Sequence, residues 1–295
     1  LTLKGAVREI LATEMLEALG VYTSKTFSVV ETGEELTRGD EPSPTRSAVM
    51  TRLSHGHIRI GTFQRAAFLD DTALLERLTD YALTRLYDEA PGDNPAAQLL
   101  GRVVERTADL AASYMVAGFV HGVLNSDNIN VTGESFDYGP WRFTPLWEPA
   151  FTAAYFDQQG LYRFGRQPLQ GGWALQQLAS ALLPLAGAED LATGLKPYER
   201  AYQESFISHT HAMLGIAPFG DPETDTEFLQ AFYAWMTETG ASWPQTFFDW
   251  FGGHESTSRA DASPQAALYK EDRFSPVRDA LVARSPVRPE RLQHA

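Results

Sequence analysis

The sequence predicts an α+β fold in which one helix and a small antiparallel sheet come first and helices form most of the remainder. Two observations support this class. In the first 65 residues an amphipathic pattern precedes segments rich in Val, Phe and Thr, whereas from Asp70 onward apolar residues recur at helical spacing. The hydrophobic share of 43% and the charged share of 21% are typical of an ordinary globular chain.

The N-terminal segment predicts a helix packed against a sheet. Apolar residues recur at helical spacing from Val7 to Leu19, and Gly20 follows where a left-handed C-terminal cap is expected. Three extended segments come next, and a polar tract containing Gly and Pro separates the first two. These predicted extended segments cover residues 25–31, 48–53 and 57–63.

The rest of the chain is predicted to be mainly helical. The clearest signal is Asn94-Pro95, because these residue types are typical of the N-cap and the first position of a helix. Two short β-prone pieces, 129–131 and 135–138, and an irregular aromatic stretch, 141–168, interrupt the helices, and the last forty residues are predicted to be weakly ordered. The predicted helices cover residues 72–87, 94–118, 172–185, 197–214, 223–238 and 245–251.

Charge and composition exclude several classes of function. With 38 acidic against 24 basic residues, the net charge of −14 argues against a nucleic-acid partner, because phosphate contacts need clustered Lys and Arg. The lack of cysteine excludes disulfides and thiolate sites. Apolar runs fall short of the ~20 residues that span a bilayer, so no membrane segment is expected. No secretory pattern follows Leu1, and a cytoplasmic bacterial protein is the simplest expectation.

Residues 121–139, HGVLNSDNINVTGESFDYG, carry the chemistry. His121, an Asn seven positions later, a β-prone piece and then Asp137 before Tyr-Gly form the skeleton of the catalytic loop and metal-binding segment of kinase-like phosphotransferases. Hard oxygen ligands on adjacent chain segments suit Mg²⁺. Asn128 and Asp137 are therefore the predicted metal ligands.

The catalytic Asp of kinases is missing from its expected position. Val123 stands two residues after the His and accepts no proton. Asp127 is the only carboxylate of the loop that could replace it as the base. Metal ligands without the usual base predict a pseudokinase with different chemistry.

At this point the sequence resembles the selenoprotein O, or YdiU, family of pseudokinases, which are protein adenylyltransferases. HGVLNSDN and FDYGP within 121–140 carry the resemblance, and the segments at 7–20 and 51–63 are similar to the family's αC helix and its TR…HxRxGTF strand pair. Downstream, residues from Asp157 to Trp173 match the pattern DxxGxYxxxxQPxxxxW. The resemblance covers roughly residues 1–185.

The resemblance implies a two-lobed protein-kinase-like fold, with a partial N-lobe at 1–66 and a helical C-lobe at 67–295. The catalytic loop is then 121–128 and the metal-binding segment 137–139. It also implies that ATP binds in an inverted orientation with Mg²⁺ or Mn²⁺. AMP passes to a Ser, Thr or Tyr hydroxyl of a protein substrate, and pyrophosphate leaves.

The resemblance implies a role for each matching residue. Lys4 is the N-lobe lysine and Glu9 its partner on the αC helix, Arg52 and Arg59 hold the terminal phosphates, Asp127 is the base, and Asn128 and Asp137 bind the metal. Guanidinium groups suit phosphate oxygens, which agrees with the arginine roles. Only four residues separate Lys4 from Glu9, a spacing that places the two poorly for pairing.

Two alternatives stay open. An aminoglycoside-phosphotransferase-like small-molecule kinase has a similar loop, HGDxxxxN, from which this chain departs at Val123. A catalytically inactive nucleotide-binding pseudokinase would keep the fold and the ligand but transfer nothing. The position of the label transferred from ATP distinguishes the three.

Overall fold

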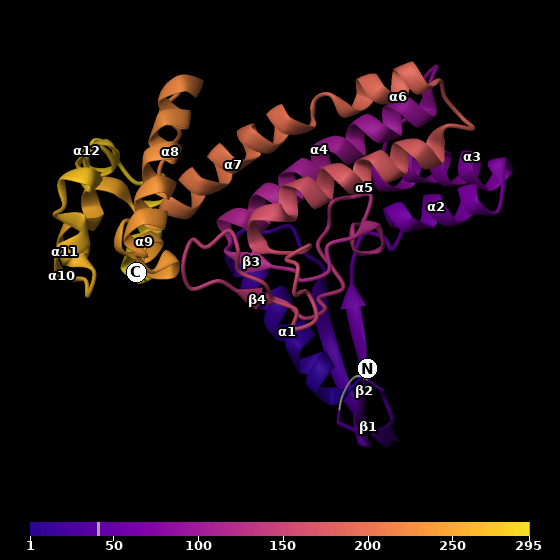
Figure 1. Cartoon of the computed structure of the whole chain (residues 1–295), viewed down its shortest axis with the longest axis horizontal. Helices are drawn as coiled ribbons and strands as arrows, with labels where there is room; N and C mark the ends of the chain where they lie inside the picture. Colours follow the sequence, from indigo (N-terminus) through magenta and orange to yellow (C-terminus); the bar gives the residue numbers. More distant parts are fainter. Residues whose placement is uncertain (40–41, 295) are drawn as a thin grey trace.

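The structure, a computed structural model that describes residues 1–39 and 42–294, is organised around one long helix, α4 (Pro95–Val116) (Figure 1). The Asn94 side chain caps this helix by accepting a hydrogen bond from the Ala97 N–H at 3.1 Å, and Pro95 occupies the first turn. The capped start at Asn94 is therefore confirmed. Neighbouring helices pack on α4: α3 (Thr72–Tyr81), α5 (Gln167–Leu182), α6 (Ala188–Leu195) and α7 (Tyr198–Leu214).

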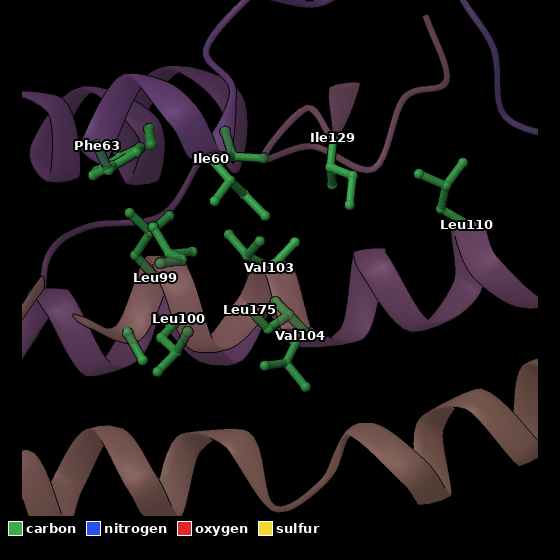
Figure 2. Close-up of a cluster of buried hydrophobic side chains, with 14 of the residues drawn as sticks. Ile60, Phe63, Leu99, Leu100, Val103, Val104, Leu110, Ile129 and Leu175 are labelled. Carbon is green, nitrogen blue, oxygen red and sulfur yellow. The ribbon is translucent and has the colours of Figure 1, made fainter. Parts of the chain in front are cut away.

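The main hydrophobic core lies on both sides of α4. Leu99 and Val103 of α4 face Ile60 and Phe63, and Leu175 of α5 belongs to the same cluster (Figure 2). All five side chains are fully buried. Because complete burial of one aliphatic or aromatic side chain contributes about 1.5–3 kcal/mol, α4 fixes the elements on either side of it.

The N-terminal helix and hairpin confirm the predicted start of the chain. α1 (Leu3–Ala18) packs on β1 (Lys25–Leu36) and β2 (Thr45–Leu53) and buries Ala12 and Leu16 in the main core. The strands pair antiparallel, with Val30 opposite Val49. Both strands extend into the polar tract between them, so the hairpin is longer than predicted.

The predicted third extended segment, 57–63, is wrong in its second half. Residues Ile60–Phe68 form helix α2, and Ile60, Phe63 and Ala66 are buried at intervals of three, which is helical periodicity. The Thr62 hydroxyl accepts from the Arg59 N–H at 3.2 Å and stabilises the start of the helix. The N-terminal sheet therefore has two strands in the part of the chain that the structure describes.

The two predicted β-prone pieces form single bridges and no strand. Asn130 pairs with Arg59, and Ser135 pairs with Thr23. The only further ladder within the described residues joins β3 (Phe119–Val120) to β4 (Arg142–Phe143). Short pairings of this kind hold loops in place without building a sheet.

The C-terminal helices form a second core beside the first (Figure 1, orange to yellow). Trp235, Trp250 and Phe274 are buried there. The expected weak order of the last forty residues is wrong, because Asp249, which is 1% exposed, accepts hydrogen bonds from Gln245, Ser263 and Tyr269 and ties them together. These helices are α8 (Pro222–Thr239), α9 (Trp243–Asp249), α10 (Thr257–Ala262), α11 (Ala266–Tyr269) and α12 (Ser275–Val282).

The predicted α+β class is confirmed, and each predicted helix from 72 onward has an observed counterpart, whereas α6, α10, α11 and α12 were not predicted. The division into an N-lobe at 1–66 and a C-lobe at 67–295 stays a prediction. Among the described residues, every helix is too short or too polar to cross a bilayer.

Removing the Tyr269 hydroxyl tests the C-terminal network. Tyr269→Phe deletes a 2.6 Å hydrogen bond to the buried Asp249 carboxylate, so the free energy of unfolding should fall by about 1–2 kcal/mol. Urea unfolding followed by tryptophan fluorescence measures the change. Tyr81→Phe is the control because Tyr81 is exposed. Equal stability of the two variants would show that Asp249 does not organise this region.

Candidate active site

The start of the loop predicted to be catalytic is fixed by a glutamine of α5. Gln167 is fully buried, its Oε1 accepts from the His121 N–H at 3.0 Å, and its Nε2 donates to the Phe119 carbonyl at 2.8 Å. Burial lowers the pKa of His121 to about 4. The imidazole is therefore neutral near pH 7 and positions the loop without serving as a proton donor.

The loop then makes a tight turn, η2 (Ser126–Asn128), that separates two side chains. Asn125 Oδ1 accepts from the Asp127 N–H at 2.9 Å, and Asn128 Nδ2 donates to the Val123 carbonyl at 2.6 Å. Asp127 is exposed, whereas Asn128 is half-buried. The turn directs the carboxylate outward and leaves the Asn128 amide oxygen without a protein donor among the described residues.

Asp127 lies against the first turn of α2. A Cβ atom added to Gly61 would lie 2.0 Å from Asp127 Oδ1, so the glycine permits the approach. Arg59 donates from Nη1 to the Asp127 carbonyl at 3.2 Å. Arg59, Gly61 and Asp127 line one open pocket with Arg65 and Phe68. The structure thus brings the predicted base and one predicted phosphate ligand together.

The second predicted metal ligand lies on the segment that follows. Asp137 is exposed and has φ +57°, a left-handed conformation that costs a non-glycine residue of order 1–3 kcal/mol. Tyr138, next to it, is buried. Strained residues of this kind are concentrated at functional sites, and this one turns a carboxylate into solvent.

A buried ion pair connects α1 to this segment. Arg52 of β2 pairs with Glu9 of α1, with side-chain exposures of 14% and 12%. The Arg52 guanidinium lies 5.7 Å from the Tyr138 ring centroid. Burial raises the pKa of the Glu9 carboxyl, Arg52 opposes the rise, and the Asp137 carboxylate adds to it. Glu9, Arg52 and Asp137 therefore belong to one electrostatic cluster.

Lys4 is not part of that cluster. It lies in the first turn of α1, exposed, and makes no ion pair among the described residues. The expected Lys4–Glu9 pairing is wrong, because Glu9 points to Arg52 and both residues belong to a single helix that begins at Leu3.

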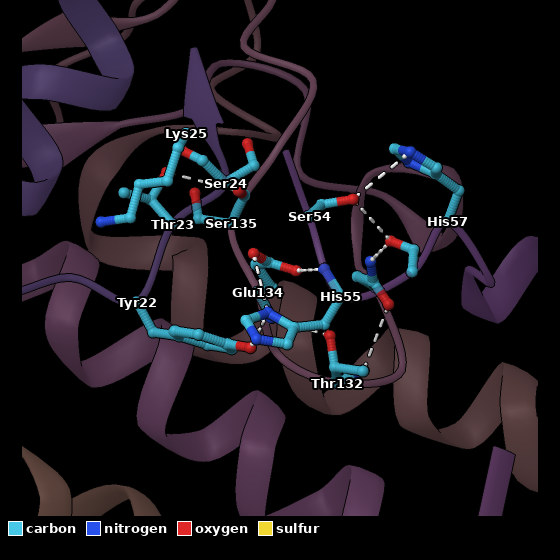
Figure 3. A network of polar contacts seen from close by, with 12 residues as sticks. Tyr22, Thr23, Ser24, Lys25, Ser54, His55, His57, Thr132, Glu134 and Ser135 are labelled. Carbon is cyan, nitrogen blue, oxygen red and sulfur yellow. Dashed lines mark hydrogen bonds and ion pairs between the residues drawn. The ribbon is translucent and has the colours of Figure 1, made fainter. Parts of the chain in front are cut away.

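A polar network attaches the hairpin to the loop before Asp137 (Figure 3). The buried Glu134 carboxylate accepts from the His55 N–H at 2.8 Å, and the Tyr22 hydroxyl lies 2.8 Å from His55 Nδ1. Thr23 and Ser135 form a backbone bridge beside it. These contacts attach the segment before Asp137 to the residues that flank the hairpin.

The residues present fit a divalent cation at Asn128 and Asp137. Both offer hard oxygen atoms that accept no protein hydrogen bond within the described residues, which is the donor type that Mg²⁺ prefers with waters completing its shell. No cluster of three or more His, Cys, Asp or Glu suited to a metal occurs in the described part of the chain.

Sequence reasoning missed Gly61, Gln64 and Arg65. Gln64 of α2 accepts from the Ser126 hydroxyl and faces Gln177 of α5 at 3.4 Å, so it links the turn to two helices. The signal that could have found them is the helical periodicity of 60–68, which was interpreted as a strand.

Breaking the buried Glu9–Arg52 ion pair should destabilise the folded protein. Glu9→Ala leaves a buried guanidinium without its partner and should lower the free energy of unfolding by about 3 kcal/mol, and Arg52→Ala by a similar amount. The double variant should lose less free energy of unfolding than the two single variants lose together. A double-mutant cycle with urea unfolding measures this coupling. The exposed pair Arg46–Glu31 on the same hairpin is the matched control. Equal coupling energies at the two pairs would contradict the description of Glu9–Arg52 as a buried ion pair.

Comparison with known proteins identifies the family. A family model described as "Protein adenylyltransferase SelO" matches residues 1–280. The chain is 46% identical over 234 residues to "Protein nucleotidyltransferase YdiU" of Synechocystis sp., covering 78% of this chain and 49% of that protein. It is 49% identical over 207 residues to the Synechococcus elongatus protein of that name, covering 70% of this chain and 42% of that protein.

A more distant relative of the same name, from Shouchella clausii, is 36% identical over 248 residues, covering 82% of this chain and 50% of that protein. The chain spans about half the length of the curated relatives that it matches. Since the family match extends over nearly the whole chain, the chain belongs to the SelO family.

Proposed function

We propose that this chain carries the transfer site of a protein adenylyltransferase, which moves AMP from ATP to a Ser, Thr or Tyr hydroxyl of a protein. The observation that carries the proposal is the position of Asp127, which is exposed in a pocket with Arg59 and precedes Asn128. Val123 occupies the position of the kinase base. The names of the relatives support nucleotidyl transfer over phosphoryl transfer.

In the proposed step the acceptor hydroxyl oxygen attacks the α-phosphorus of ATP. The new oxygen–phosphorus bond forms as the bond to the bridging oxygen between the α- and β-phosphates breaks, and pyrophosphate leaves with that oxygen. Asp127 accepts the hydroxyl proton. Arg52 and Arg59 bind the charge of the leaving group, and the buried Arg52 Nε, which has no partner among the described residues, supplies a free donor.

Asn128 and Asp137 would hold the divalent metal, Mg²⁺ or Mn²⁺. A metal there supplies positive charge that offsets the negative charge of the phosphates. The protein's own contribution is orientation. The Asn128–Val123 hydrogen bond fixes the amide, and the φ of Asp137 fixes the carboxylate.

An inactive nucleotide-binding protein is the second candidate, and the placement of Lys4 favours it. An exposed lysine on the first turn of α1 is poorly placed to hold phosphates inside the site. Binding of ATP without transfer of any part of it would support this candidate. The following two experiments separate the possibilities.

ATP labelled at the α- or the γ-phosphate identifies the reaction. We expect α-label on protein when the chain is incubated with a bacterial protein mixture, and Asp137→Ala should reduce it at least about hundredfold, because one metal ligand is lost. Scintillation counting of gel bands measures the label. Transfer of γ-label alone would overturn the proposal in favour of a kinase.

Gly61 provides a second test that leaves every polar group in place. Gly61→Ala places a methyl group 2.0 Å from Asp127 Oδ1, so the carboxylate must move, and the transfer rate should fall by roughly a hundredfold. Gly101→Ala is the matched control, since Gly101 also lies in a helix and its added Cβ meets nothing within 4 Å. Equal rates for the two variants would show that Asp127 is not the base.

A further inference from the structure

We propose that the face of α2 beside Asp127 is the docking surface for the acceptor, and that it selects acceptors with an acidic side chain two residues from the modified hydroxyl. The docking surface consists of Gly61, Arg65 and Phe68. The proposal rests on the proposed function, because it takes Asp127 as the group that meets the hydroxyl.

The three residues of the docking surface form one stripe along α2. Gly61 and Arg65 are four residues apart and Phe68 follows three later, so all lie on the same face of the helix. They line the pocket that contains Asp127. A hydroxyl that reaches the Asp127 carboxylate over Gly61 therefore brings the neighbouring acceptor residues over Arg65.

Arg65 is free and already oriented. It is exposed, and in the part of the chain described here neither Arg65 nor Arg59 pairs with a carboxylate. Its guanidinium lies 5.8 Å from the Phe68 ring centroid, so the aromatic side chain supports it. In a chain with 38 acidic and 24 basic residues, unpaired arginines at a pocket mark where an anion is accepted.

The spacing fixes which acceptor residue Arg65 contacts. Four helical residues rise about 6 Å, whereas an extended chain advances about 3.3 Å per residue. An extended acceptor crossing Gly61 therefore places its second residue from the hydroxyl at Arg65 and the third near Phe68, which is 78% exposed. The fitting partner is an extended segment with an acidic and then an apolar residue.

The acidic residue of an acceptor fits this surface better than the nucleotide phosphates do. Of the groups assigned to the nucleotide and the metal, Arg52 and Asp137 lie with Glu9 and Tyr138, whereas Arg59 lines the pocket beside Asp127. Arg65 lies one helical turn beyond Gly61 in the same pocket, farther along α2 from Arg59. The overall negative charge repels acidic segments, so binding of such a segment depends on this local cation.

Fluorescent ten-residue peptides with one central Tyr test the proposal. They carry Glu, Gln or Lys two residues before or after the Tyr, and both binding without ATP and α-label transfer are measured. We expect the best Glu peptide to bind more tightly than its Gln and Lys counterparts, and Arg65→Gln to weaken it roughly fivefold. Arg65→Glu should reverse the preference toward Lys. Arg77→Glu, at an exposed arginine of α3, is the matched control.

The outcomes separate this inference from the proposed function. If α-label is transferred equally to Glu, Gln and Lys peptides whatever stands at 65, the docking surface is wrong and the function stands. If the Arg65-dependent preference is seen in binding but no peptide or protein receives label, the function fails and the surface stands. A change in the KM for ATP with unchanged peptide binding would assign Arg65 to the nucleotide and overturn the inference.

Discussion

The packing around α4 is the constraint on which the candidate site depends. In the loop from His121 to Asn128 the side chains of His121, Leu124 and Ser126 are buried, whereas Asp127 is exposed and Asn128 half-buried. Its ends are fixed as well. Gln167 holds the start through two backbone hydrogen bonds, and Ile129, which is 1% exposed, anchors the end in the core beside Ile60 (Figure 2). The same burial of Ile60 that creates α2 also brings Gly61 to Asp127.

The electrostatics follow from a second shared contact. Glu9 and Asp137 are close enough for one carboxylate to raise the pKa of the other, and Arg52 is the guanidinium beside them. The local charge is therefore negative before a nucleotide arrives. In the proposed reaction a triphosphate adds further negative charge, so a bound cation is needed for it to enter. Asn128 and Asp137, on separate segments, are the proposed ligands for that cation.

The sequence predicted part of the fold, and its assignment of Asn128 and Asp137 as metal ligands, made from kinase-like spacing, stays a prediction. α4 was predicted because Asn94-Pro95 marks a helix start. The helix at Ile60–Phe68 was missed because Ile, Phe and Thr are β-prone, and burial against α4 outweighed that preference. The order of the last forty residues depends on Asp249, whose partners lie up to twenty residues away and leave no local pattern.

Around the proposed base, polar side chains of one short turn point in two directions. In the turn Ser126–Asn128, Asn128 points back to the Val123 carbonyl while Asp127 points outward over Gly61. A base at position 123 would lie on the stretch that Asn128 contacts, on the same side as the metal ligands. A base at 127 instead faces α2, so in the proposed reaction the acceptor hydroxyl arrives over Gly61, in the pocket that Arg59 also lines. Because α2 replaces what the sequence indicated as a strand, the proposed acceptor surface is a helix face, whose side chains are spaced one turn apart. If Asp127 is the base, as proposed, its change of position affects the surface that contacts the acceptor as well as the chemistry.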